Sequence, residues 1–237
     1  IGDIFRHTFD SVTSPLDELV LDFDLGSAKE TNLICLINHN MQGYAYTISF
    51  GTTSGASDVG SETGTLWTGT DYDSKNDLLY FATAYTARYV RIAVAIPVAS
   101  TIDIGRCWMD SAWSYNNLMD FSMGIVDRST MTKSRAGSSY VSPRQILRTL
   151  DIRAHGSSND DFYGSSSDAL MKSFLTMDLA VGESGEVVCI PMTANTHERQ
   201  RSGVYGTIRR NNPIRVIDKG GNGYLSEKRF TVEEDKA

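Results

Sequence analysis

Alternating apolar and polar residues in short runs dominate the first half of the chain. In residues 44–50 the large side chains of Tyr44, Tyr46, Ile48 and Phe50 occupy every second position, which is the period of a strand with one buried face. Further strands are expected at residues 19–25, 32–38, 89–96 and 102–109.

Glycine-rich and polar segments separate these strands. Residues 26–29, Gly-Ser-Ala-Lys, predict a turn after the first strand, and residues 51–64, which are rich in Gly, Ser and Thr, predict a surface loop. Short strands separated by turns are typical of an all-β sandwich. Residues 15–112 are therefore predicted to form one domain of this kind.

The pattern changes in the second half. Residues 127–143 carry many Ser, Thr, Arg and Lys residues and few apolar ones, which predicts an extended, partly exposed arm that reaches a neighbouring molecule. One helix is expected at about residues 167–181, where Ser167 is placed to cap the N-terminus and Gly182 lies past the end. Residues 113–237 are predicted to form an antiparallel sheet carrying this helix. Its strands are expected at residues 144–154, 185–192, 203–209, 214–217 and 225–232.

The formal net charge of −7 is unevenly distributed, because most of the excess acid lies in residues 1–110. An acidic surface repels a phosphate backbone, so specific binding of nucleic acid is not expected. The basic side chains of residues 128–153 are expected on solvated strand faces or in subunit contacts. No apolar run approaches the roughly 18 to 20 residues that cross a bilayer, and the N-terminus lacks the order of a secretory signal.

Residues that carry chemistry are scattered. Cys35, Cys107 and Cys189 lie far apart in apolar runs, which is typical of small buried side chains, while a Cys35–Cys107 bridge within one sandwich stays an alternative. The histidines are widely separated, and the common hydrolase and nucleotide-binding motifs do not occur. Residues 71–77 place oxygen ligands at alternate positions, but Lys75 stands where a calcium loop needs a ligand. We therefore expect no enzyme, no metal site and no cofactor.

Two segments of the first domain carry a more specific resemblance. Asp22-Phe23-Asp24-Leu25-Gly26 and Ala87-Arg88-Tyr89-Val90-Arg91-Ile92 resemble the discoidin or galactose-binding-like β-sandwich. The resemblance implies a jelly-roll fold for residues 15–112 and a role in binding rather than catalysis. Aromatic and amide groups suited to holding a sugar ring lie in or beside predicted loops of this domain. These candidate glycan contacts are Trp67, Tyr72, His39 and Asn40.

Longer stretches resemble minor tail or baseplate proteins of long-tailed bacteriophages. The stretches are Ile102-Asp103-Ile104-Gly105-Arg106, Phe121-Ser122-Met123-Gly124-Ile125-Val126-Asp127, Ser202-Gly203-Val204-Tyr205-Gly206 and Lys228-Arg229-Phe230-Thr231-Val232-Glu233-Glu234. Where the family often shows Ser-Arg-Gly-Gly, this chain has Ser134-Arg135-Ala136-Gly137. The resemblance implies a structural component of the virion tail tip, such as the distal tail protein, assembled in the host cytoplasm. Copies would form a ring, with six favoured and three second, between the tail tube and the hub or receptor-binding proteins.

The arm predicted at residues 127–143 fits a subunit of a ring, because a segment poor in core-forming residues becomes ordered when a neighbour buries it. Such rings use heterologous contacts, in which one surface of each copy fits a different surface of the next. The candidate subunit contacts are Arg128, Lys133, Arg135, Tyr140 and Arg144. The alternative function is a carbohydrate-binding adhesin, whose first domain contacts host surface glycans.

Overall fold

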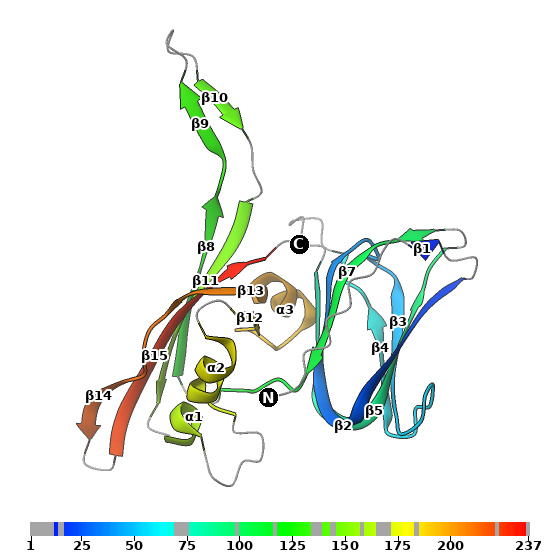
Figure 1. The fold of residues 1–237 in the computed structure, drawn as a ribbon, viewed down its shortest axis with the longest axis horizontal. Helices are drawn as coiled ribbons and strands as arrows, with labels where there is room; N and C mark the ends of the chain where they lie inside the picture. Colours follow the sequence, from blue (N-terminus) through cyan, green and yellow to red (C-terminus); the bar gives the residue numbers. More distant parts are fainter. Residues whose placement is uncertain are drawn as a thin grey trace. The chain divides into compact units, whose positions relative to one another are not determined.

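Figure 1 shows the fold of this 237-residue chain as a computed structural model. Backbone contacts divide the chain into two units, one of residues 2–112 with 193–200 and one of residues 113–192 with 201–236. Residues 193–200 thus belong to the first unit, although the sequence pattern predicted them in the second domain. The structure describes residues 12–13, 17–68, 76–97, 100–115, 118–133, 139–142, 146–156, 159–164, 172–182, 185–220 and 223–235.

The first unit is built from antiparallel strands. They are β1 (Val12–Thr13), β2 (Glu18–His39), β3 (Ala45–Gly51), β4 (Gly60–Thr65), β5 (Asp77–Ala95), β6 (Thr101–Ile102) and β7 (Ile104–Asp110). β1 pairs with β6, and the others form a five-stranded sheet in the order β4-β3-β5-β2-β7. The long strands β2 and β5 pair along most of their length and form the centre of the sheet.

β2 is one long strand that bends where the sequence predicted a turn. Its register against β5 shifts between Asp24 and Lys29 and then resumes, so the chain keeps its direction instead of reversing. Gly26 takes a φ of 76°, which glycine adopts without steric cost, and its N–H donates to Asp24 Oδ1. Hydrogen bonds from Arg88 and from the Gly26 N–H lower the pKa of Asp24 to about 2. The turn predicted at residues 26–29 is wrong, because this bend stays within a paired strand.

The sheet corrects two further expectations for the first unit. β5 begins at Asp77 rather than at residue 89, because the apolar residues 78–80 pair with β2. Residues 60–65, most of which were expected in a loop, form β4 and pair with β3. Gly60 of β4 leaves room for a large neighbour, because a Cβ at this position would lie 2.3 Å from the ring of Tyr85. The glycine that suggested a loop therefore serves close packing.

A cluster of buried apolar side chains forms the core of the first unit. It includes Phe23, Ile34, Leu36, Ile48, Phe50, Phe81, Ile92, Cys107 and Met109. Residues 33–37 of β2 are all buried, so both faces of the strand are covered there, which explains their unbroken apolar run. Cys35 and Cys107 are buried and free, as expected of small apolar side chains, and no bridge joins them. Burial raises the pKa of the Cys107 thiol to about 12.

The second unit is built on another antiparallel sheet. Its strands are β8 (Leu118–Asp127), β9 (Thr130–Lys133), β10 (Ser139–Ser142), β11 (Ile146–Gly156), β12 (Glu186–Cys189), β13 (Val204–Asn211), β14 (Arg215–Gly220) and β15 (Gly223–Glu234). The main sheet has the order β12-β13-β15-β11-β8, with β14 also on β15, and β9 pairs with β10. The mainly β, antiparallel fold expected from the sequence is confirmed in both units.

The predicted helix is shorter than expected. The helices are α1 (Asn159–Tyr163), α2 (Phe174–Val181) and α3 (Thr196–Ser202). Ser173 is extended, and its hydroxyl accepts the N–H of Thr176 at 3.2 Å, which caps α2 and fixes its start. A cap at Ser167 lies outside the described residues, while Gly182 ends α2 with a φ of 62°, as expected. None of the described helices is long and apolar enough to cross a membrane.

The ring of Phe174 anchors α2 to the sheet of the second unit. Its centroid lies 4.8 Å from the ring centroid of Trp113, 5.2 Å from that of Tyr115 and 5.4 Å from that of Phe162. Edge-to-face and tilted arrangements of this kind add to the burial energy of the aromatic rings. Beneath them lie core residues from the central strands, Leu150, Ile152, Ile208, Phe230 and Val232.

Candidate functional site

The edge strand β8 carries an apolar stripe that its own chain does not cover. Among the described residues β8 pairs with β11 alone. Phe121 lies opposite Ile152 and Met123 opposite Leu150, and directly paired residues share a face of the sheet. Ile152 and Leu150 are buried in the core, yet Phe121, Met123 and Ile125 are 38%, 42% and 71% exposed. The core-facing side of the sheet therefore continues onto an open edge.

The arm extends from this same edge. β8 leads into β9, and β10 leads back towards β11, so the two pairs form one long hairpin that projects from its sheet (Figure 1). Met131 and Tyr140 on the hairpin are 66% and 63% exposed, and Ile146 at the start of β11 is half-exposed. The extended, partly exposed hairpin or loop predicted at residues 127–143 is thus a hairpin in its described parts. Contact with a neighbour stays a prediction.

The candidate subunit contacts lie on or beside the arm. Arg128 is half-exposed and forms an ion pair with Glu233 of β15, so it braces the base of the arm against its own sheet. Lys133 and Tyr140 are exposed on the hairpin. Arg135 and Arg144 lie outside the described residues. The structure thus presents Lys133 and Tyr140 to solvent and gives Arg128 a partner within the chain.

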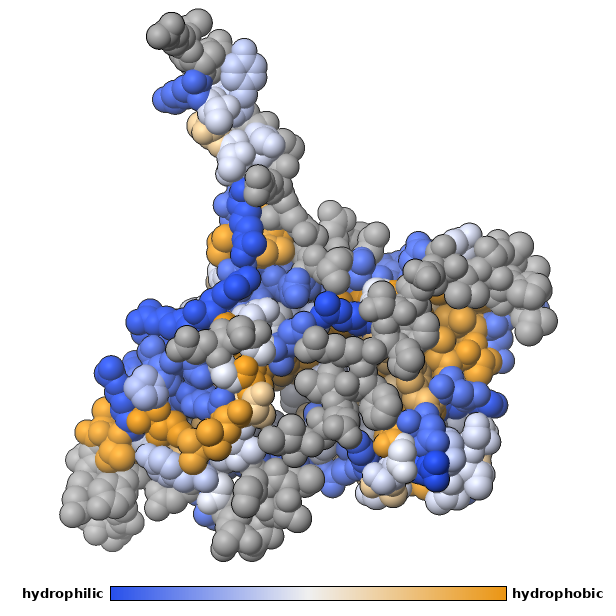
Figure 2. All heavy atoms as spheres, viewed as in Figure 1, coloured by the Kyte–Doolittle hydropathy of each residue, from blue (hydrophilic) through white to orange (hydrophobic). Residues whose placement is uncertain are grey.

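Figure 2 shows apolar side chains gathered at the base of the arm and, separately, over β14. The exposed apolar residues of the second region are Val216, Ile217 and Leu225. β14 pairs with β15 on the side away from β11, so it lies towards the opposite end of the sheet from β8. The second unit therefore carries exposed apolar side chains on two separate strands that bound its sheet.

The other face of the sheet is charged and internally paired. Arg229 donates to Asp151 at 2.6 Å and Arg153 to Glu227 at 3.0 Å, in each case between β11 and β15. These hydrogen bonds lower the pKa of both carboxyls below their ordinary values. Exposed ion pairs of this kind are typical of a solvated face. The uncovered apolar stripe thus lies on one face of the sheet only.

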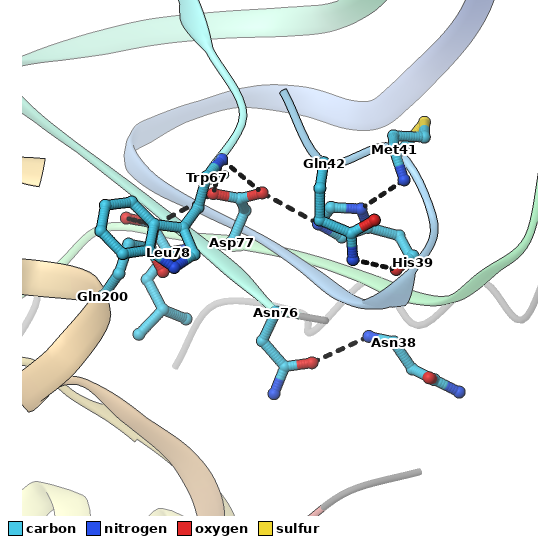
Figure 3. A network of polar contacts seen from close by, with 9 residues as sticks. All are labelled: Asn38, His39, Met41, Gln42, Trp67, Asn76, Asp77, Leu78 and Gln200. Atoms are coloured by element: carbon cyan, nitrogen blue, oxygen red, sulfur yellow. Dashed lines mark hydrogen bonds and ion pairs between the residues drawn. The ribbon is translucent and has the colours of Figure 1, made fainter. Parts of the chain in front are cut away.

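A buried polar network lies at the end of β2 in the first unit (Figure 3). The carboxylate of Asp77 is within 2.9 Å of His39 Nε2, and it accepts the Trp67 N–H at 2.9 Å and the Gln200 side-chain N–H at 3.1 Å. The amide of Gln200 also pairs with the backbone of Leu78. The network joins β2, β5, the segment after β4 and α3.

His39 is held in the network through both nitrogens of its ring. Its Nδ1 accepts the N–H of Met41 at 3.0 Å, so the ring proton is on Nε2 and is donated to Asp77. Both ring nitrogens are therefore used within the protein, and the ring is buried. A general base needs a free nitrogen within reach of its substrate. The His39–Asp77 pair therefore joins parts of the fold together.

The predicted glycan contacts do not form a sugar-binding platform in the described part of the chain. His39 was expected in or beside a loop and available to a glycan, but it ends β2 and the network buries its side chain. Asn40 uses its side chain within the protein, accepting the N–H of Asp103 and donating to the carbonyl of Thr101. The half-buried ring of Trp67 packs against that of His197, with centroids 5.5 Å apart. Tyr72 lies outside the described residues.

Sequence reasoning missed two features of these sites. The alternation of Phe121, Met123 and Ile125 with smaller residues signals a strand with one apolar face, but not that this face is uncovered. The second feature is the buried position of Asp77, which the sequence presents only as the last of the alternating oxygen-bearing residues 71–77. Its position directly before a short apolar run was the only available signal that it begins a buried strand.

Comparisons with known proteins yield no identification. No family model, curated protein or solved structure matches the chain. The described residues also contain no group of three or more His, Cys, Asp and Glu side chains placed to hold a metal ion.

Proposed function

We propose that this chain is a structural subunit of a bacteriophage tail tip or baseplate, in which copies form a ring between the tail tube and the hub or receptor-binding proteins. The observation that carries the proposal is the open β8 edge, whose apolar stripe continues a buried core face. The sequence resemblance to tail and baseplate proteins supports the same role. In this proposal the first unit is a galactose-binding-like jelly roll, and its single core enclosed by antiparallel strands supports that interpretation.

An open edge strand of this kind favours addition of a strand from another molecule. Monomeric proteins protect their sheet edges with lysines, prolines, bulges or very short strands. β8 has 10 residues, contains no lysine, arginine or proline, and pairs without a register shift against β11. Main-chain hydrogen bonds would supply affinity there, while Phe121, Met123 and Ile125 would bury apolar area.

A second copy of the chain offers a suitable partner for β8. The same sheet presents β14 on its other side, with Val216 and Ile217 exposed. Pairing β8 of one copy with β14 of the next would join the sheets edge to edge through two different surfaces. Repetition of such a heterologous contact closes into a ring when the rotation permits, and we favour six copies over three.

The Met123→Lys, Ile125→Lys double variant tests the proposal. A charged side chain buried in the contact must be desolvated without a partner, so we expect the association constant of the purified chain to fall at least about tenfold in sedimentation velocity. Ser122→Lys is the matched control, because Ser122 lies on the other face of the same strand, and it should change association less than about threefold. Equal association of the double variant and the wild type would contradict the proposal.

A further inference from the structure

A polar cavity of about 180 Å³ lies at the charged face of the second unit. It is lined by Arg210, Asn212, Pro213, Arg215, Glu227 and Arg229. These residues come from the end of β13, the turn after it, the start of β14, and β15, which lie side by side in Figure 1. The cavity thus gathers guanidinium groups from three different strands.

The carboxylates near the cavity are already engaged. Glu227 accepts a hydrogen bond from Arg153 at 3.0 Å, and Asp151 beside the cavity accepts two from Arg229. Arg210 and Arg215 are exposed, and their charges help to lower the pKa of the Asp151 and Glu227 carboxyls. The Arg210 Nε also donates to Asn212 Oδ1 at 3.4 Å. Arg210, Arg215 and Arg229 thus line the cavity together with a single carboxylate, Glu227, so the lining has an excess of positive charge.

The turn that shapes the cavity is fixed from both sides. The N–H of Asn212 donates to the carbonyl of Arg229 at 3.0 Å, and the carbonyl of Asn212 accepts from Lys228 Nζ at 2.8 Å. Lys228 is fully buried and paired with Asp178 of α2, so it holds this carbonyl in place. Pro213 fixes its own φ. A preformed wall of this kind lowers the conformational entropy that the protein must lose when a ligand binds.

We propose that this cavity binds a phosphate group, either the free ion or a small phosphate monoester. Guanidinium groups match phosphate oxygens through paired N–H donors, and a tetrahedral dianion directs its oxygens towards several of them at once. A planar carboxylate is matched by a single arginine fork, so it uses fewer of the groups present. Arg229 keeps N–H donors free beyond those that Asp151 takes, because a guanidinium carries five.

The Arg210→Gln, Arg215→Gln double variant tests this site by isothermal titration calorimetry with inorganic phosphate and with glycerol 3-phosphate. We expect one saturable site in the wild type and affinity at least about tenfold weaker in the variant, since charge-assisted hydrogen bonds are lost. The matched control is Arg128→Gln, Arg209→Gln, which removes the same charge from residues that pair with Glu233 outside the cavity. Its affinity for phosphate should stay within about twofold of the wild type.

The two ligands distinguish the sources of the phosphate. Tighter binding of glycerol 3-phosphate assigns the site to a monoester, and tighter binding of inorganic phosphate assigns it to the free ion. The proposal is overturned if the wild type shows no saturable binding, if acetate binds as tightly as phosphate, or if both double variants weaken binding equally. Circular dichroism of each variant verifies that the fold is kept.

Discussion

Replacement of Asp77 by alanine is expected to lower the free energy of unfolding by about 3 to 5 kcal/mol. The substitution leaves His39 Nε2–H, the Trp67 N–H and a Gln200 side-chain N–H without their shared acceptor in a buried environment. A buried donor without a partner costs about 1 to 3 kcal/mol, and effects within one network are not additive. Urea denaturation followed by circular dichroism measures the change.

Asp103→Ala is the matched control for Asp77→Ala. Its carboxylate is exposed and receives one long hydrogen bond, from Asn40 at 3.5 Å. Surface substitutions of this type change the free energy of unfolding by about 0.5 kcal/mol or less. Asp77→Asn keeps one carbonyl acceptor, so its loss in the free energy of unfolding should lie between those of Asp77→Ala and Asp103→Ala. If Asp77→Ala is no more destabilising than Asp103→Ala, the network does not hold the first unit together.

Removal of the arm is expected to abolish assembly while leaving the fold of the second unit intact. Asp127 and Ile146 pair directly, so an Asn-Gly turn in place of residues 128–145 closes β8 and β11 into an ordinary two-residue hairpin. The excised segment holds Met131 and Tyr140, which contribute nothing to the core of their own chain. Removal of the segment also breaks the ion pair between Arg128 and Glu233. Because Arg128 is half-exposed, this pair contributes about 1 kcal/mol or less to the free energy of unfolding.

Sedimentation velocity and thermal melting measure the two consequences of arm removal. We expect single copies in place of the assembly, with a melting temperature within a few degrees of the wild type. A companion variant, Met131→Ser with Tyr140→Ser, keeps the hairpin and removes its apolar side chains, so it should weaken assembly in part. Complete assembly without the arm would contradict the prediction that the arm reaches a neighbouring copy and is needed for the ring.

The elements best predicted from the sequence are those whose pattern is set by local burial. The strict alternation in residues 44–50 predicted β3 because one face of that strand packs on the core. The polar composition of residues 127–143 predicted an extended, partly exposed hairpin or loop for the converse reason. In both cases the burial or exposure of the side chains follows a regular pattern along the segment, and the residue types show that pattern directly.

The expectations that proved wrong depend on contacts between distant residues. The glycine and polar residues after Leu25 have the composition of a turn, but β2 pairs with β5 on both sides of the bend, so the chain does not reverse there. His39 has the character of a loop residue, and only Asp77 and Met41 show that its ring is buried and fully bonded. Gln200 reaches Asp77 across 123 positions of sequence, and no local pattern records such a contact.

A structure of the assembled particle by electron cryomicroscopy is the most direct test of the proposal that this chain builds a ring. We expect a closed ring of copies, six favoured, in which β8 of each copy pairs with β14 of the next and Met123 and Ile125 are buried. Single copies, or a ring whose contacts leave β8 exposed to solvent, would contradict it.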